Sequence, residues 1–405
     1  MKILHYSFYV SVDNDSITRR KTGYGYMVMD IINSIKKKNS KIYVLTSTGI
    51  TSERKIASVE FISNKWVDFF SNMRFFDLVE AIKVIITNKV SFHESIRIFY
   101  SSLQRGYFNK VAKSYDILHF HGVGPTNIDV IKDFVKQGRK VIVTLHGLNS
   151  FDPIVNVTDY ANKVEKDFLL FASEWNVPVS VISSGVKNEI ERYLKGVDVS
   201  NFVVITNGTS LINEYSPKVD IRKKHSIPKK AKIAICVGNI CERKNQIEVV
   251  EAYNTLESLY QEDLYIIFLG NEFEPYPVSK RVKELKFEDK LIFAGAIPKE
   301  EMPNYYLNCD FTILASISEG FGLSIIEGFQ YGKPSLTYSD IDAIDDIYSD
   351  CSIIKIESRS SESLANGIKA MLDNEWENDK IIEHSERFSL SKMADKYMRL
   401  YNEVR

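Results

Sequence analysis

Short apolar runs alternate with amphipathic stretches along most of this chain, and this alternation limits the possible folds more than any other feature. In the second half, apolar runs of strand length are each followed by a stretch with apolar residues at helical spacing. Strands that are apolar throughout are typical of parallel sheets, because helices cover both faces of such a sheet. The alternation therefore predicts an α/β protein with parallel sheets.

The same pattern predicts the individual elements. Strands are predicted in the second half at residues 233–238, 264–270, 291–295, 311–314, 335–338 and 352–356, with helices at 246–260, 279–287, 299–308, 323–331 and 361–372. Strands are predicted in the first half at 3–9, 41–45, 116–121, 140–145, 178–182 and 202–206, with a helix at 26–37, a largely helical stretch at 66–112 and a last helix at 389–404.

The length of 405 residues is more than one small core needs, so we expect two Rossmann-like, doubly wound domains of roughly 200 residues each. The boundary is predicted after Asn207 and Gly208, in the polar stretch from Pro217 to Pro228. The first domain is then 1–208 and the second 209–389. In such folds ligands bind at the carboxyl ends of the strands.

Composition indicates an ordinary globular protein, with 44% hydrophobic and 26% charged residues. No apolar run reaches 18 residues, so no membrane span is expected. Residues 1–10 are predicted to form a first strand rather than a signal peptide, because Asp13 and Asp15 follow at once. The four cysteines are scattered without a C-x-x-C pair, which favours a reducing cytoplasm over a disulfide framework or a zinc site.

Charge is unevenly distributed, since residues 1–110 hold 17 Lys and Arg against 9 Asp and Glu in a chain of net charge −1. Aromatic residues are frequent in the same region, which also has two dense basic spots. A basic and aromatic surface suits an anionic membrane face or an anionic acceptor, whereas the alternative is a solvated face over an ordinary core. Nucleic acid is not expected, because the chain as a whole is not basic. The basic spots are Arg19–Lys21 and Lys36–Lys38 with Lys41, and the aromatics are Trp66, Phe69, Phe70, Phe75, Phe76, Phe92, Phe99 and Tyr100.

Two glutamates, Glu319 and Glu327, stand eight positions apart in the segment 318–334, SEGFGLSIIEGFQYGKP. An apolar run precedes the segment, and a glycine-containing turn leads into a short helix that starts at Leu323. Free backbone N–H groups at a helix start bind phosphate well. Both carboxylates could face the same ligand-binding site at this helix start. For either glutamate alone, the alternative is a solvated surface charge.

This segment resembles the E-x7-E signature of family 4 retaining glycosyltransferases, which have the GT-B fold, with two Rossmann-like domains facing across a cleft. The resemblance implies that Glu327 binds the ribose hydroxyls of a nucleotide-sugar and that Glu319 lies beside the donor sugar. It also implies that the backbone between them contacts sugar and diphosphate. The residues assigned to this contact are Phe321, Gly322, Leu323 and Ser324.

Two cations, Arg243 and Lys244, stand between the strand at 233–238 and the next helix, where they could neutralise a diphosphate. The alternative is a pair of solvated charges. The family has basic residues here that hold the leaving diphosphate, although Asn239 occupies a position where Arg is common. Gly238, directly after the strand, is assigned to the same donor site.

The resemblance implies further roles outside these segments. His146, in TLHG at a strand end, would lie near the donor sugar. Gly23, in the loop KTGYG, would approach diphosphate and acceptor, and Ile297 would contact the nucleobase. The last helix, 390–405, would cross back onto the first domain. His119 and His121 form an H-x-H pattern, but neither a carboxylate nor a third histidine stands at a suitable spacing, so packed histidines are favoured over a metal site.

The prediction is a cytoplasmic, metal-independent, retaining glycosyltransferase that needs no cofactor, with peripheral contact at the inner membrane face left as an open alternative. Its donor would be a nucleotide-diphosphate sugar, with UDP favoured, and its acceptor a hydroxyl of a glycan or lipid-linked molecule in bacterial surface polysaccharide or glycoconjugate synthesis. Two alternatives stay open: a non-catalytic nucleotide-sugar-binding subunit and a sugar-nucleotide epimerase.

Overall fold

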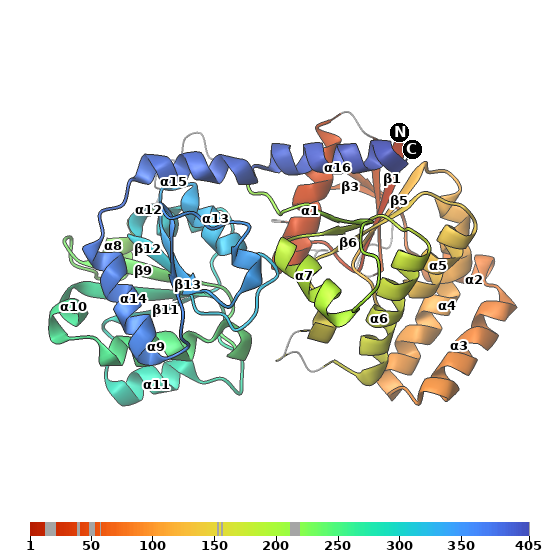
Figure 1. Ribbon diagram of the computed structural model, residues 1–405. Helices are drawn as coiled ribbons and strands as arrows, with labels where there is room; N and C mark the ends of the chain where they lie inside the picture. The colour runs from red at the N-terminus through yellow and green to blue at the C-terminus, as the bar shows by residue number, and fades with distance from the viewer. Residues whose placement is uncertain are drawn as a thin grey trace. The chain divides into compact units, whose positions relative to one another are not determined.

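The computed structural model describes residues 1–12, 22–38, 41–47, 53–56, 58–151, 154, 157–210 and 219–404. The basic spot Arg19–Lys21 and the first two residues of the predicted polar stretch, Pro217 and Lys218, lie outside these residues. The chain forms two compact units, Met1–Asn207 with Leu390–Arg405, and Gly208–Ser389. Each unit is a sheet covered by helices (Figure 1), as the alternating pattern predicted.

The sheet of the first unit has the strand order β3-β4-β2-β1-β5-β6-β7-β8, and all its neighbours are parallel except β3 and β4. The strands β3 and β4 were not predicted, because three residues are too few to show a pattern of alternation. The strands are β1 (Lys2–Ser7), β2 (Lys41–Thr46), β3 (Arg54–Ile56), β4 (Val59–Phe61), β5 (Ile117–His121), β6 (Val141–Leu145), β7 (Val179–Val181) and β8 (Phe202–Val204).

Helices of the first unit include the last helix of the chain, α16, which contributes to this unit's core. The hydroxyl of Tyr401 lies 2.7 Å from Nδ1 of His119, and that of Tyr397 lies 3.2 Å from Oγ1 of Thr144. The helices are α1 (Gly23–Lys36), α2 (Trp66–Asn72), α3 (Phe75–Asn88), α4 (Phe92–Ala112), α5 (Ile128–Lys136), η1 (Asn149–Phe151), α6 (Asp159–Glu174), α7 (Ser184–Tyr193) and α16 (Leu390–Val404).

The second unit is built on a parallel sheet of order β11-β10-β9-β12-β13-β14. The helix predicted at 246–260 is divided into two helices, because Leu256 has an extended backbone. The helix α15 was not predicted. The strands are β9 (Lys232–Val237), β10 (Leu264–Leu269), β11 (Leu291–Gly295), β12 (Phe311–Leu314), β13 (Ser335–Tyr338) and β14 (Ile353–Ile356). The helices are α8 (Ile221–Lys224), η2 (Glu242–Lys244), α9 (Gln246–Thr255), α10 (Ser258–Asp263), α11 (Val278–Leu285), α12 (Met302–Asn308), α13 (Leu323–Phe329), η3 (Asp342–Ile344), α14 (Ser361–Asp373), α15 (Asn378–Ser385) and η4 (Glu386–Phe388).

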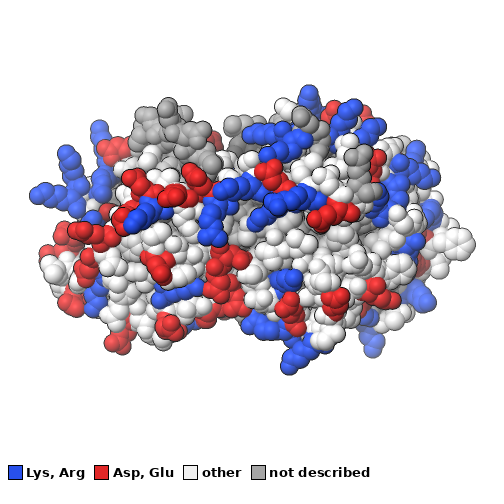
Figure 2. All heavy atoms as spheres, turned by 45° about the horizontal axis from the view of Figure 1, so that its top comes forward, with Lys and Arg blue, Asp and Glu red and all other residues white. Residues whose placement is uncertain are grey.

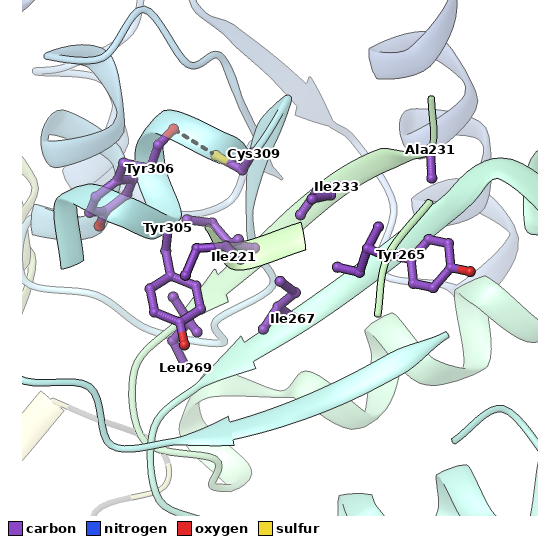
Figure 3. Packing of buried hydrophobic residues seen from close by; sticks show 11 residues of the cluster. Ile221, Ala231, Ile233, Tyr265, Ile267, Leu269, Tyr305, Tyr306 and Cys309 are labelled. Carbon is purple, nitrogen blue, oxygen red and sulfur yellow. Dashed lines mark hydrogen bonds between the residues drawn. The ribbon is translucent and has the colours of Figure 1, made fainter. Parts of the chain in front are cut away.

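The core of the second unit contains a cluster in which α12 packs on the sheet. Tyr305 and Tyr306 of α12 belong to it together with Ile233, Ile267 and other buried side chains of β9 and β10 (Figure 3). In the described part of the chain, no helix combines the length and apolar character needed to cross a bilayer.

The strand orders determine where a ligand can bind in each unit. In the second unit the order reverses between β9 and β12, so the loops after these two strands leave the sheet on opposite sides and open a crevice. The first unit reverses between β1 and β5. Ligands of open α/β sheets bind at such reversal points, outside the carboxyl ends of the strands.

Candidate active site

Two loops meet at the reversal point of the second unit. One follows β9 and carries Arg243 and Lys244, and the other follows β12 and carries Glu319. The backbone joins them, because the N–H of Ile317 donates to the carbonyl of Arg243 at 2.8 Å. Residues 75 positions apart in the sequence are therefore held side by side where a ligand is expected.

Glu319 is the charged centre of this junction. Its Oε1 accepts a hydrogen bond from Nζ of Lys244 at 2.5 Å and from the hydroxyl of Ser316 at 2.6 Å. A guanidinium nitrogen of Arg243 lies 3.7 Å from its Oε2 and donates to the carbonyl of Ser318 at 3.1 Å. Burial alone would raise the pKa of Glu319, but the charges of Lys244 and Arg243 hold it below the usual range. The junction thus contains an ionised carboxylate with two cations, which leaves one positive charge in excess.

Gly238 makes room for the lysine of this junction. Its φ of 131° favours glycine, and a Cβ at this position would lie 3.2 Å from Cε of Lys244. A larger residue here would push Lys244 away from Glu319. The predicted site residues Gly238, Arg243, Lys244 and Glu319 are therefore close together.

Glu327, on α13, is held by a tyrosine that sequence reasoning missed. The hydroxyl of Tyr306 donates to Oε2 of Glu327 at 2.8 Å, and it lies 3.3 Å from the carbonyl of Ser324. Burial, and then the charge of Glu327, raise the pKa of Tyr306 far above its usual range, so the phenol keeps its proton. Tyr306 stacks on Tyr331 with ring centroids 5.6 Å apart. The carboxylate of Glu327 is thus oriented from the core side, and no local sequence pattern indicates this.

The turn between the two glutamates buries its aromatic side chain. Phe321 is buried with its ring 6.1 Å from that of Phe388, so only its backbone can meet a ligand. Gly322 has a φ of 91°, and a Cβ there would lie 3.1 Å from Ile344. Leu323 and Ser324 are half-buried in the first turn of α13. Ile297 is partly buried against the core cluster of Figure 3.

Arg359 is a second residue that sequence reasoning missed. Its guanidinium donates to both carboxylate oxygens of Asp340, at 2.6 and 2.8 Å, and to the carbonyl of Ser316 at 2.9 Å. It also lies over the ring of Tyr338, 4.4 Å from its centroid. Arg359 therefore stabilises the loop that carries Glu319. It stands 40 residues after Glu319 in the sequence, and no motif indicates it.

The other predicted site residues, Gly23 and His146, belong to the first unit. Tyr24 connects their surroundings, because its ring lies 5.1 Å from that of His146 and its hydroxyl donates to the carbonyl of His121 at 2.8 Å. Gly23 begins α1 and is exposed, and no described atom lies within 4 Å of where its Cβ would be. Gly25, in contrast, is closely approached by Ser11.

A row of histidines runs from His146 into the core of the first unit. Nε2 of His146 lies 3.1 Å from Nδ1 of His121, whose Nε2 lies 2.9 Å from Nδ1 of His5. Burial lowers the pKa of His5 to about 3 and that of His146 to about 4, and it lowers that of His121 well below its usual range. All three rings are therefore neutral at pH 7.

The structure adds the third histidine that the H-x-H spacing did not show. Ring nitrogens of His5, His119 and His121 all lie within 4.8 Å of one another, a set that could hold a metal ion. Both nitrogens of His119, however, lie 2.7 Å from hydroxyls, those of Tyr401 and Thr144. A metal would have to break these bonds in a fully buried site, so we retain the interpretation as packed histidines.

The surroundings of His5, at the buried end of the row, indicate which ring nitrogens carry protons. Nε2 of His5 is buried and has no hydrogen-bond partner among the described residues, and an orphaned buried N–H group is rarer than an under-satisfied acceptor. His5 therefore donates from Nδ1 to His121, and His121 donates from Nδ1 to Nε2 of His146. In this arrangement His146 carries its proton on Nδ1 and presents a donor to its surroundings.

The chain is similar to known glycosyltransferases. Residues 217–388 match the family described as glycosyl transferases group 1. The O-antigen biosynthesis glycosyltransferase WclY of Escherichia coli is 26% identical over 303 residues, which cover 72% of this chain and 80% of that protein.

Two solved structures have the same fold over the full chain. A glycosyltransferase from Rickettsia africae has a TM-score of 0.69 at 18% identity, covering 100% of this chain and 98% of its own. Anabaena Alr3699/HepE, solved in complex with UDP and glucose, has a TM-score of 0.67 at 14% identity, covering 100% of both chains. Residues 217–388, most of the second unit, therefore belong to the glycosyl transferases group 1 family, and the chain is a glycosyltransferase with the GT-B fold.

Proposed function

We propose that the protein is a retaining transferase that moves a sugar from a UDP-sugar to a hydroxyl of a glycan or lipid-linked acceptor, in the synthesis of a bacterial surface polysaccharide or glycoconjugate. The observation that carries this proposal is the junction of Arg243, Lys244 and Glu319 at the reversal point of the second sheet. Before the donor binds, the carboxylate of Glu319 pairs with these cations, so they are not buried as unpaired charges. The cations can then bind the diphosphate.

The proposed chemistry begins with the glycosyl–phosphate bond, whose cleavage leaves negative charge on the diphosphate. Arg243, Lys244 and the backbone N–H groups of Leu323 and Ser324 stabilise this charge. Each preorganised donor of this kind lowers a barrier by on the order of 3 kcal/mol. When Lys244 also donates to the diphosphate, the carboxylate of Glu319 can accept hydrogen bonds from hydroxyls of the donor sugar.

Retention of the sugar's configuration follows in the proposal from attack on the face that the diphosphate leaves. The acceptor hydroxyl gives its proton to the departing phosphate oxygen as the new glycosidic bond forms, so no protein nucleophile and no metal are required. His146 and Gly23 are proposed for the donor sugar and the acceptor side, Gly238 and Phe321 to Leu323 for close backbone contact, and Ile297 for the base. The first domain, 1–208 with the last helix, is assigned to the acceptor and 209–389 to the donor.

The choice of donor and acceptor is supported by the compared proteins. The HepE complex contains UDP and glucose, and WclY is named for O-antigen biosynthesis. We propose a cytoplasmic protein, because the four scattered cysteines favour a reducing compartment.

The proposal is tested by incubation of the protein with a panel of UDP-, GDP- and ADP-sugars without acceptor. Slow release of UDP from a UDP-sugar, with the α-configured sugar as the first product from an α-linked donor, is the expected result. Conversion of the donor to its epimer would instead identify an epimerase. Binding of the donor with neither release nor conversion would identify a non-catalytic nucleotide-sugar-binding subunit.

Replacement of Glu327 is expected to weaken nucleotide binding. Glu327→Gln removes the charged acceptor for the ribose hydroxyls, and a hydrogen bond to a charged group corresponds to about a 10- to 100-fold change in affinity. Isothermal calorimetry with UDP measures the change, with the exposed Glu300→Gln as control. Tyr306→Phe, which leaves the carboxylate without its orienting hydroxyl, should show a smaller loss. An unchanged affinity of Glu327→Gln would contradict the ribose assignment.

A further inference from the structure

Helix α3 is amphipathic, but its polar side rather than its apolar side packs on the rest of the protein. It buries Asp77 and Ala81, while Phe75, Phe76 and Ile86 are exposed by 72%, 83% and 71%. A helix on the surface of a globular protein ordinarily turns its apolar side to the core. The apolar side of α3 therefore faces outward.

Ion pairs explain how the polar side of α3 is held. Arg74 forms two hydrogen bonds of 2.7 Å with Asp77, and Arg105 of α4 reaches Asp77 at 3.6 Å. Arg105 also pairs with Glu80 at 2.5 Å and with Asp133 of α5 at 2.6 Å. This network attaches α3 to its neighbours through charges, so its outward apolar side is a defined feature of the fold rather than a loosely packed one.

The neighbouring helices α2 and α4 extend this surface (Figure 1). Within the described residues, eleven of the nineteen large apolar side chains that are exposed lie between Val67 and Phe99. Phe92, Ile96 and Phe99 follow one another at helical spacing on α4. We call the exposed side chains of residues 67–99 the α2–α4 face. An apolar concentration of this kind marks an interaction site.

The charges around the α2–α4 face are almost all positive. Among residues 65–112 the exposed cations are Lys65, Arg74, Lys83, Lys89, Arg97 and Lys110, whereas Glu80, paired with Arg105, is the exposed carboxylate. Asp77 and Glu94 are buried. The right-hand edge of Figure 2, where these helices lie, accordingly shows mainly white and blue atoms. Two copies of such a face would repel each other, while an anionic surface would attract it.

We propose that the α2–α4 face is a docking surface for an anionic lipid bilayer, with the aromatic and branched side chains in the acyl boundary and the cations among the headgroups. This surface contains five of the aromatic residues that the composition suggested, Phe70, Phe75, Phe76, Phe92 and Phe99, but not all of the suggested residues belong to it. Phe69 is fully buried in the core, and Lys38 pairs with Asp395 of α16. The inference goes beyond the proposed transfer reaction and does not depend on it.

Vesicle flotation tests the apolar part. The full chain is mixed with phosphatidylcholine vesicles that contain about 30% phosphatidylglycerol, or with pure phosphatidylcholine vesicles. We expect flotation with the anionic vesicles, and at least a tenfold weaker partition for Phe75→Ser with Phe76→Ser. The matched control is Leu259→Ser with Phe273→Ser, two exposed apolar residues of the second unit, which should partition as the unmodified protein does.

The charged part is tested by Lys83→Glu with Lys89→Glu, compared with Lys229→Glu with Lys230→Glu in the second unit. The first pair should weaken partition by at least fivefold per cation, and the control pair by much less. Equal binding to neutral vesicles, binding that survives both changes on the α2–α4 face, or self-association of the chain in place of vesicle binding would overturn the proposal. UDP release without acceptor should be the same in all four variants, which separates this inference from the transferase proposal.

Discussion

Lys244→Ala should lower the rate of transfer by about 100- to 1,000-fold, which is the loss seen when one preorganised donor to a developing negative charge is removed. The expected loss is in kcat more than in KM, because the diphosphate gains charge only as the glycosyl bond breaks. Steady-state kinetics of UDP release measure both parameters. An activity within a fewfold of the unmodified enzyme would remove Lys244 from the leaving-group role.

The Lys244→Ala change also removes a cationic partner from the carboxylate of Glu319. Glu319 is 9% exposed and would keep only Arg243 as a cationic partner, and breaking such a buried pair lowers the free energy of unfolding by about 3–5 kcal/mol. Lys244→Met combined with Glu319→Gln removes both charges and should regain most of this stability while remaining inactive. Chemical denaturation and kinetics of the single and double variants therefore separate a folding defect from a catalytic one. If activity returned together with stability, the charge of Lys244 would have no part in the reaction.

Acidification below pH 6.5 should destabilise the protein steeply. His5, His119 and His121 are fully buried, and burial lowers their pKa values well below 6.5, to about 3 for His5. Below pH 6.5 the unfolded chain therefore binds protons that the folded chain does not. The stability is fully present above pH 6.5 and is lost as the pH falls toward the folded-state pKa values. With His146, whose pKa burial lowers to about 4, four such groups correspond to about 5 kcal/mol between pH 6 and pH 5.

Denaturant titrations at half-unit steps of pH measure this slope. His5→Asn keeps a donor at the position of Nδ1 and removes one of the four titrating rings, so the slope should fall by about a quarter. His93→Asn, at an exposed position on α4, serves as the control. Parallel curves for the unmodified protein and His5→Asn would contradict the assignment of a neutral buried histidine row.

Periodicity was sufficient for most of the fold. Strands such as β12 and β13 were predicted at their observed bounds, since a buried parallel strand is a continuous apolar run whose ends are visible in the sequence. The pattern failed for the short strands β3 and β4 and for the breaks within 66–112. There α3 turns its apolar side away from the core, so helical periodicity persists but does not indicate what the helix packs on.

The sequence by itself determined the fold class, the family resemblance and the loops that carry the candidate site, because these depend on residues that are neighbours along the chain. Only the tertiary structure decided which side chains meet. Lys244 and Glu319 are 75 positions apart, Tyr306 and Glu327 are 21 apart, and His5 and His121 are 116 apart. Each pair forms only because parallel strands bring the ends of distant segments to one edge of a sheet, or because helices pack beside them. Such contacts lower the free energy of the folded chain without requiring any local pattern, and for this reason the partners of the predicted residues could not be derived from the sequence.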